Sequence, residues 1–229
     1  LTDEHRRFLK ESKVPVVIVG QETEMASCIY HDDFGAGRAM GKEVAVKALK
    51  RNGGRPEDCK IAYIGVTRED KAAGAAREDG FRKGLQEAGI TFDDHRYRRE
   101  SEFTMSGGYE AAVDLLSEEN GIDIISCATD TIAAGAIEAL IAQSKKAVPE
   151  SVQNSGARML HILEQSDICV TGFGDNQMLR AVTGGIPTVH FGYKTSGIKG
   201  AELLLEQIEE KNPVPVHMKL GFQIVNRFE

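Results

Sequence analysis

The sequence predicts an α/β fold in which parallel sheets are flanked by helices. Short apolar segments alternate with longer segments of helical periodicity along most of the 229 residues, which is the order of strand–helix–strand units. The segment 124–136 shows this best, because an apolar run passes through Thr129 and Asp130 into a helical pattern. The length allows one or two compact units.

The amino-terminal half begins this alternation. The predicted elements are a helix at 3–12, a buried strand at 15–20, a short strand at 27–30, a helix opened by 31–38 and ending near 50, and a strand at 60–65. The next helix carries one apolar stripe, formed by Arg77, Phe81, Leu85 and Ala88. This stripe places Arg77 at the amino-terminal end of the helix, toward the carboxyl edge of the sheet.

The carboxyl-terminal half continues in the same order. The predicted elements are an edge strand at 95–99, a loop entering a helix at 102–109, a strand and helix at 124–141, an extra helix at 151–165, strands at 167–173 and 188–191, a helix capped by Thr195 or Ser196, and closing strands at 214–219 and 221–227. The helix after 195 is expected to bury one apolar face, comprising Ile198, Ala201, Leu204, Leu205 and Ile208.

Composition excludes several classes of function. Acidic residues outnumber basic ones by 35 to 28, giving a formal charge of −7, which argues against a broad nucleic-acid or membrane surface. No apolar run approaches the ~20 residues of a membrane span. The four cysteines form no CxxC pair, so we expect reduced thiols in a cytoplasmic protein.

Motifs for catalysis and for cofactors are absent. The glycines at 35, 37 and 41 are spaced GxGxxxG, which is not the dinucleotide-binding fingerprint. The sequence contains no GxSxG, no HExxH and no Walker loop. The adjacent carboxylates Asp32 and Asp33 would face opposite ways in an extended segment. We therefore predict no cofactor, no metal and no enzymatic activity.

Polar side chains follow two predicted strands at their carboxyl ends. Thr129 and Asp130 follow one strand and Asp175 follows another; in open α/β sheets this edge is where small ligands bind. Thr129 and Asp130 are candidates for ligand hydrogen bonds, and the alternative is that one of them is only a helix N-cap. Asp175 is an acceptor for ligand hydroxyls or a turn residue.

Two further side chains are candidates for the same cleft. Arg77 can fork onto hydroxyls, a carboxylate or a phosphate; alternatively it packs its stem on the core and pairs with Asp79 or Glu69. Phe103 is an aromatic residue in a polar loop, so it can stack on a sugar ring or insert into the core.

An ordered set of motifs resembles one family. These motifs are DDFGAGR at 32–38, REDGF at 77–81, ATDTIAAGA at 128–136, TGFGDN at 171–176 and the segment from Thr188 to Gly197. In this order they resemble the effector-binding core of the lactose/galactose repressor (LacI/GalR) family over nearly the whole chain. The segment 188–197 is most similar to the sucrose-operon repressor branch.

The resemblance implies a two-lobe, type I periplasmic-binding-protein-like fold with its amino-terminal part missing. It implies an amino lobe of 1–30 plus 190–217, a carboxyl lobe of 31–189 plus 218–229, and an effector held between them. The family positions implied for ligand contact fall on Tyr30, Arg77, Phe103, Thr129, Asp130, Asp175 and Phe191. The sequence departs from the family at Thr129, where Asn is common, at Gly174, where the ligand-binding Asp falls, and at the insertion 151–166.

The expected function is that of the ligand-sensing domain of a sugar-responsive transcriptional repressor. The expected partners are a sugar or phosphosugar effector, a second copy in a homodimer, and operator DNA bound through a headpiece before Leu1; no membrane partner is expected. The main alternative is a solute-binding protein of a sugar transporter, which shares the two-lobe design. A further alternative is an α/β enzyme whose site has no recognised motif.

Overall fold

A computed structural model describes residues 1–144, 166–210 and 214–228. The chain forms two compact units: unit 1 comprises Leu1–Asp32 and Phe191–Phe222, and unit 2 comprises Asp33–His190 and Gln223–Glu229. The last segment of unit 1 ends at Phe222 rather than at the predicted residue 217. The reason is that β8 (His217–Leu220) pairs with β2 (Ser27–His31) of unit 1. The extra helix expected at 151–165 lies outside the described residues.

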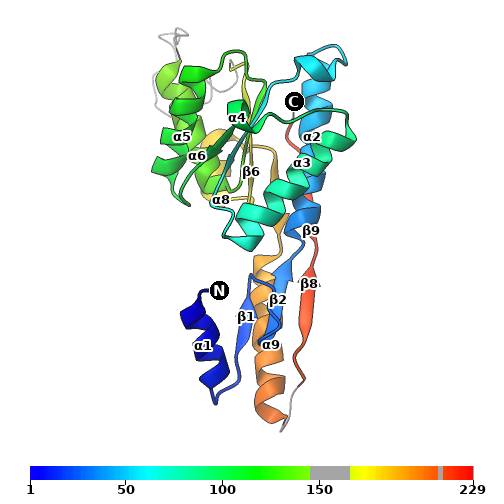
Figure 1. Ribbon diagram of the computed structural model, residues 1–229, viewed down its shortest axis with the longest axis vertical. Helices are drawn as coiled ribbons and strands as arrows, with labels where there is room; N and C mark the ends of the chain where they lie inside the picture. The colour runs from blue at the N-terminus through cyan, green and yellow to red at the C-terminus, as the bar shows by residue number, and fades with distance from the viewer. Residues whose placement is uncertain (145–165, 211–213, 229) are drawn as a thin grey trace. The chain divides into compact units, whose positions relative to one another are not determined.

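Unit 1 is a three-stranded parallel sheet with helices. The strand order is β1-β2-β8, with β1 at Val17–Val19 (Figure 1). The first helix, α1 (Asp3–Glu11), is capped by Thr2 and buries none of its residues. The last, α9 (Tyr193–Glu209), packs on β1 and β2.

The buried face of α9 differs from the predicted apolar face. The helix buries Ser196, Gly200 and Leu203, whereas Ile198, Leu205 and Ile208 are 49 to 61% exposed. Small residues decide this face, because a Cβ on Gly200 would lie only 2.9 Å from Val19 Cγ2. The prediction of a Thr195 or Ser196 cap is also wrong, since the helix begins at Tyr193 after Gly192.

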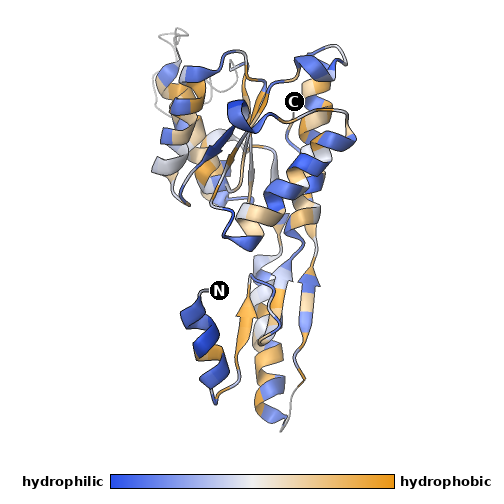
Figure 2. Cartoon of the chain, in the orientation of Figure 1, coloured by the Kyte–Doolittle hydropathy of each residue, from blue (hydrophilic) through white to orange (hydrophobic). Residues whose placement is uncertain are grey.

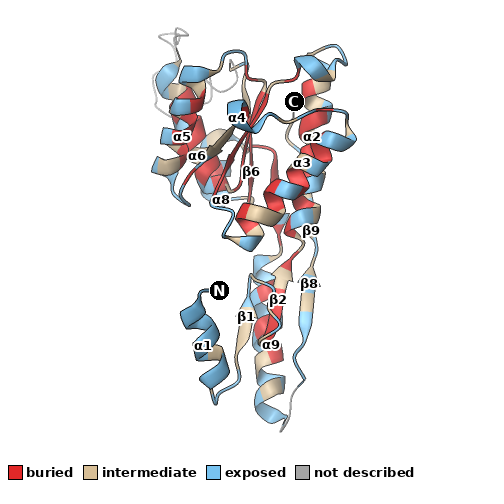
Figure 3. Cartoon of the chain, in the orientation of Figure 1, coloured by how far each residue is buried: buried red, intermediate tan, exposed pale blue. Residues whose placement is uncertain are grey.

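Unit 2 contains a sheet in the order β4-β3-β5-β6-β7-β9. Its strands are β3 (Ile61–Gly65), β4 (Arg98–Glu100), β5 (Ile124–Cys127), β6 (Cys169–Phe173), β7 (Thr188–Phe191) and β9 (Phe222–Val225). The pairs from β4 to β7 are parallel, which confirms the predicted α/β class. Every residue of β3 and β5 is buried, as expected for continuous apolar runs covered on both faces (Figures 2 and 3).

Two closely packed helix pairs lie on opposite sides of this sheet (Figure 1). The helices are α2 (Asp33–Arg51), α3 (Arg77–Glu87), α5 (Met105–Glu118) and α6 (Asp130–Gln143). Glycines permit the close approach within a pair: a Cβ on Gly37 of α2 would lie 2.1 Å from the Arg77 oxygen, and one on Gly135 of α6 would lie 2.0 Å from the Met105 oxygen. The stripe predicted for α3 is confirmed by its buried Arg77, Phe81 and Leu85.

One of the remaining elements of unit 2 differs from its prediction. The prediction of a strand at 95–99 is wrong for its first half, because Asp94–Tyr97 forms a helical turn, α4, before β4. Asp93 caps this turn by accepting the backbone N–H groups of His95 and Arg96. A short helix, α8 (Gln177–Thr183), follows β6. None of the helices in the described residues is both long and apolar enough to cross a membrane.

Candidate ligand-binding site

The strand order of unit 2 marks a ligand edge. From β3 the chain adds β4 on one side and then β5 on the other side of β3, so the direction of winding reverses between β3 and β5. In open α/β sheets the crevice at the carboxyl ends of such strands is where ligands bind. The segments that begin there are Val66–Thr67 after β3 and Ala128–Thr129 after β5.

Arg77 lies at this reversal and is held by the protein. Its Nε donates to Asp33 Oδ1 at 2.7 Å, and its Nη1 donates to the carbonyl of Ala128 at 2.8 Å. The guanidinium also lies 5.2 Å from the centre of the Phe173 ring. The Arg77 and Asp33 side chains are only 11 and 8% exposed. Arg77 therefore lies at the predicted edge and has a carboxylate partner. That partner is Asp33 and not the predicted Asp79, which pairs with Arg68.

At the strand-to-helix junction, Thr129 takes the N-cap alternative. Thr129 is the N-cap of α6 and accepts the backbone N–H of Ile132 at 3.2 Å. Asp130 is buried, and its two oxygens accept from the Asn176 backbone N–H at 2.6 Å and the Thr188 hydroxyl at 2.7 Å. Both carboxylate oxygens thus bind protein groups, and Asp130 ties the α6 amino terminus to the loop after β6 and to β7.

The neighbourhood of Asp130 is tight and charged. Burial raises the pKa of Asp130, and a Cβ on Gly172 would lie 2.2 Å from its Oδ1, so β6 requires glycine there. Asp175 has a left-handed backbone with φ of 50°. Its carboxylate accepts from Arg227 Nη2 at 3.1 Å and lies 3.3 Å from His190 Nδ1. Asp175 is therefore a turn residue, which is one of the two predicted alternatives.

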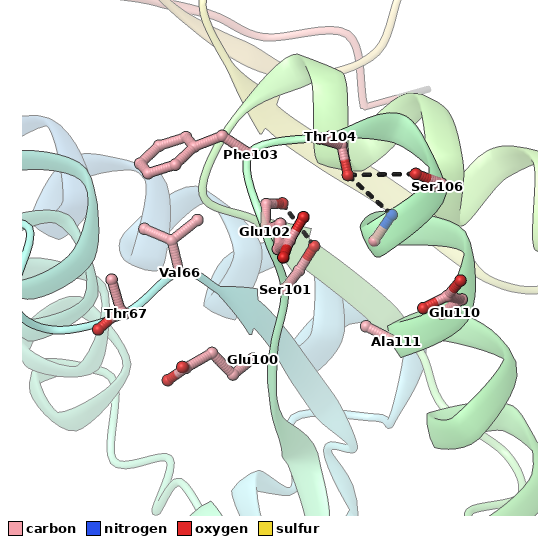
Figure 4. A pocket seen from close by; sticks show the side chains of 11 residues that line it. Val66, Thr67, Glu100, Ser101, Glu102, Phe103, Thr104, Ser106, Glu110 and Ala111 are labelled. Atoms are coloured by element: carbon pink, nitrogen blue, oxygen red, sulfur yellow. Dashed lines mark hydrogen bonds between the residues drawn. The ribbon is translucent and has the colours of Figure 1, made fainter.

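Phe103 lines a hollow of about 620 Å³ at the carboxyl ends of β3 and β4. The lining residues are Val66, Thr67, Glu100, Ser101, Glu102, Phe103, Thr104, Ser106, Gly107, Glu110 and Ala111. Figure 4 shows Phe103 and Val66 on one side and the start of α5, with Thr104 and Ser106, on the other. Phe103 is 49% exposed, so its ring is available to a ligand rather than inserted in the core.

Unit 2 thus brings five of the predicted residues to one sheet edge. They are Arg77, Phe103, Thr129, Asp130 and Asp175. Arg77 and Asp130 do not line the hollow that contains Phe103, so the edge has two neighbouring parts. Unit 1 holds the other two residues, Tyr30 and Phe191.

The two unit 1 residues are described within that unit. The Tyr30 hydroxyl donates to Glu22 Oε1 at 2.6 Å, and this bond raises the pKa of Tyr30 to about 12. Phe191 is fully buried, and its ring centre lies 4.8 Å from that of His31. Both side chains are therefore engaged in local contacts.

Several residues of the edge were not predicted. Asp33, the partner of Arg77, is the first residue of α2 rather than part of an extended pair with Asp32. Its position before a run of helical periodicity is the signal that could have identified it. Glu102 and Glu110 line the hollow, and neither belongs to a motif. In the part of the chain that the structure describes, no group of three or more His, Cys, Asp or Glu side chains could hold a metal ion.

Comparisons with known proteins agree with this architecture. Residues 7–212 match the family model described as a periplasmic binding protein domain. The sucrose operon repressor of Staphylococcus xylosus is 26% identical over 92% of this chain, and the HTH-type transcriptional regulator CelR of Thermobifida fusca is 26% identical over 96%. The chain covers 56 and 58% of these two relatives, so it spans little more than half of their length.

Solved structures give the same fold. A LacI family transcriptional regulator from Enterococcus faecium with bound ribose superposes with a TM-score of 0.75 at 20% identity, over 100% of this chain and 75% of that one. A complex of the transcriptional regulator CelR with cellobiose has a TM-score of 0.74 at 25% identity, over 98% of this chain and 61% of that one.

Proposed function

Because this chain belongs to the periplasmic binding protein domain family, we propose that it is the effector-sensing part of a sugar-responsive transcriptional regulator. A regulator is favoured over a transporter component because the curated relatives named above are a repressor and a transcriptional regulator. The same proposal includes the absence of enzymatic activity, operator DNA as a partner of the whole protein, and a homodimeric state.

One observation in the structure carries the sugar assignment. The carboxyl edge of unit 2 places the half-exposed ring of Phe103 beside a hollow lined by four hydroxyl side chains, Thr67, Ser101, Thr104 and Ser106. An aromatic face suits the C–H face of a sugar ring, and hydroxyl and carboxylate oxygens suit its hydroxyl groups. This combination recognises a polyol rather than an apolar molecule.

A sensing mechanism follows from the chain path. The chain passes between units 1 and 2 at 32–33, 190–191 and 222–223. A sugar that binds one arrangement of the units more tightly than another shifts the population toward that arrangement. A coupling of ~1–3 kcal/mol changes the affinity for a second partner by about 5- to 150-fold. That range is sufficient for a regulatory switch.

Titration calorimetry tests this function with sucrose, ribose and cellobiose. We expect at least one of them to bind with a dissociation constant below about 1 mM. Phe103→Ala should weaken that binding about tenfold, since a lost aromatic contact costs roughly 1.5 kcal/mol. The matched control is Phe8→Ala, because Phe8 is also exposed, at 59%, and lies on α1.

Three results would count against the proposal. Absence of binding by all three sugars would contradict the sugar assignment. Equal weakening by Phe8→Ala and Phe103→Ala would contradict the placement of the site. Recovery of a chemically altered sugar after incubation would indicate an enzyme instead.

A further inference from the structure

The charges that line the hollow all have one sign. Its charged lining residues are Glu100, Glu102 and Glu110, and the described residues that line it include no lysine, arginine or histidine. Arg98 pairs with Glu100 at 3.0 Å and also approaches Glu78 at 3.5 Å. In the described part of the chain no ion pair involves Glu102 or Glu110. A ligand in the hollow therefore meets a negative potential.

The arginines elsewhere along this edge are already matched by carboxylates. Arg77 pairs with Asp33 at 2.7 Å, and both side chains are largely buried. Arg227 pairs with Asp175 at 3.1 Å and donates to the carbonyl of Ile186 at 2.9 Å. Recruiting Arg77 to an anion would leave the buried Asp33 carboxylate without this partner, which is costly. Recruiting Arg227 would take the arginine away from the half-buried Asp175 carboxylate.

The amino terminus of α5 borders the hollow and needs separate consideration, because helix amino termini attract phosphate. Thr104, the N-cap, already accepts the Gly107 N–H through its hydroxyl at 3.0 Å and the Gly108 N–H through its carbonyl at 3.1 Å. Glu102 and Glu110 flank this turn in Figure 4. The carboxylates thus occupy the position in which a bound phosphate would need cations.

We infer that the hollow receives an uncharged polyol and that the sensor discriminates against phosphorylated sugars. This inference rests on the proposed function. Carboxylate oxygens accept hydrogen bonds from sugar hydroxyls, and these charge-assisted bonds are strong. A phosphate ester carries about −1.5 to −2 charges at neutral pH; it is repelled by the carboxylates and loses its hydration without gaining a cation. The sequence alone had left open whether the effector is a sugar or a phosphosugar.

Calorimetry on the intact chain with matched pairs tests the inference. The probes are sucrose and sucrose 6-phosphate, ribose and ribose 5-phosphate, and cellobiose and cellobiose 6-phosphate. In the pair that binds, we expect the neutral member to bind at least about tenfold more tightly. A phosphate ester that binds as tightly as its neutral partner overturns the inference while leaving the sugar-sensing function in place. Absence of binding by both members of every pair overturns the proposed function itself, and the inference with it.

Charge-neutral variants locate the source of the selectivity. The double variant Glu102→Gln and Glu110→Gln removes two charges from the hollow, and we expect it to narrow the affinity ratio at least about threefold by tightening the ester. Glu57→Gln is the matched control, because Glu57 is exposed and precedes the amino end of β3, away from the hollow. An unchanged ratio in the double variant, with the circular dichroism spectrum of the wild type, would overturn the assignment of selectivity to the hollow.

Discussion

Replacing Gly37 by alanine should separate α2 from α3 at the point where the edge is assembled. The new Cβ would lie 2.1 Å from the Arg77 oxygen, 2.9 Å from its carbonyl carbon and 3.0 Å from the Phe81 nitrogen. These are backbone atoms, so no side-chain rotation relieves the overlap. Alanine gains about 1 kcal/mol of helix propensity over glycine, but overpacking costs typically ~1–3 kcal/mol or more. Because the obstacle is backbone, we expect an overpacking cost at the high end of this range. The free energy of unfolding should then fall by a net amount of about 1–2 kcal/mol.

Thermal unfolding followed by far-ultraviolet circular dichroism measures this change. For a chain of this size 1 kcal/mol lowers Tm by about 2–4 °C. The matched control is Gly197→Ala in α9, where a Cβ meets nothing within 4 Å, so only the propensity gain remains and stability should rise. A Gly37→Ala protein as stable as the wild type would refute the close-packing argument.

Two further substitutions test the buried polar groups of unit 2. Asp130→Asn replaces one of the two carboxylate oxygens that accept from Asn176 and Thr188 by an NH2 donor. One of these bonds is then lost, which should cost about 1–3 kcal/mol in urea unfolding; full retention of stability would show that the lost bond contributes nothing. Burial raises the pKa of Asp130, so its contribution is complete below about pH 4 and falls as pH rises through the raised pKa. The stability difference between the wild type and Asp130→Asn should therefore narrow from pH 4 to pH 7, and a widening difference would contradict that sign. Tyr63→Phe should leave Tm unchanged or raise it, because the Tyr63 hydroxyl is buried without a hydrogen-bond partner among the described residues; a clear fall in Tm would indicate a partner.

Local patterns in the sequence were sufficient wherever an element is surrounded by its own unit. The apolar run before Thr129 became the fully buried β5, and the helical pattern after it became α6, which buries Ile132, Ala133 and Ala136. Such elements leave little choice of face, since burial on both sides of a sheet requires continuous apolar residues. Gly37, which lets α2 approach α3, is also visible in the sequence, but the sequence does not show that it packs against the backbone of Arg77.

The same reasoning failed for α9. Its larger apolar residues predicted one buried face, yet the helix packs on β1 and β2 through Ser196 and Gly200, and Ile198 stays 49% exposed. Hydrophobic periodicity counts apolar area and ignores how closely a small residue allows two backbones to approach. The Ser196 hydroxyl, which contacts His31 Nε2 at 2.9 Å, adds a polar reason for that face that no pattern contains.

For this protein the sequence alone determined the α/β class, most of the order of strands and helices along the chain, and the strand ends at which polar side chains cluster, but it missed α4 and α8. Only the tertiary structure decided what those side chains bind: Asp33 for Arg77 across 44 residues, and Thr188 for Asp130 across 58. The physical reason is the separation along the sequence over which each interaction acts. Periodicity and capping depend on neighbours within one or two turns, whereas an ion pair or a buried hydrogen bond depends on which distant segment the fold brings within 3 Å.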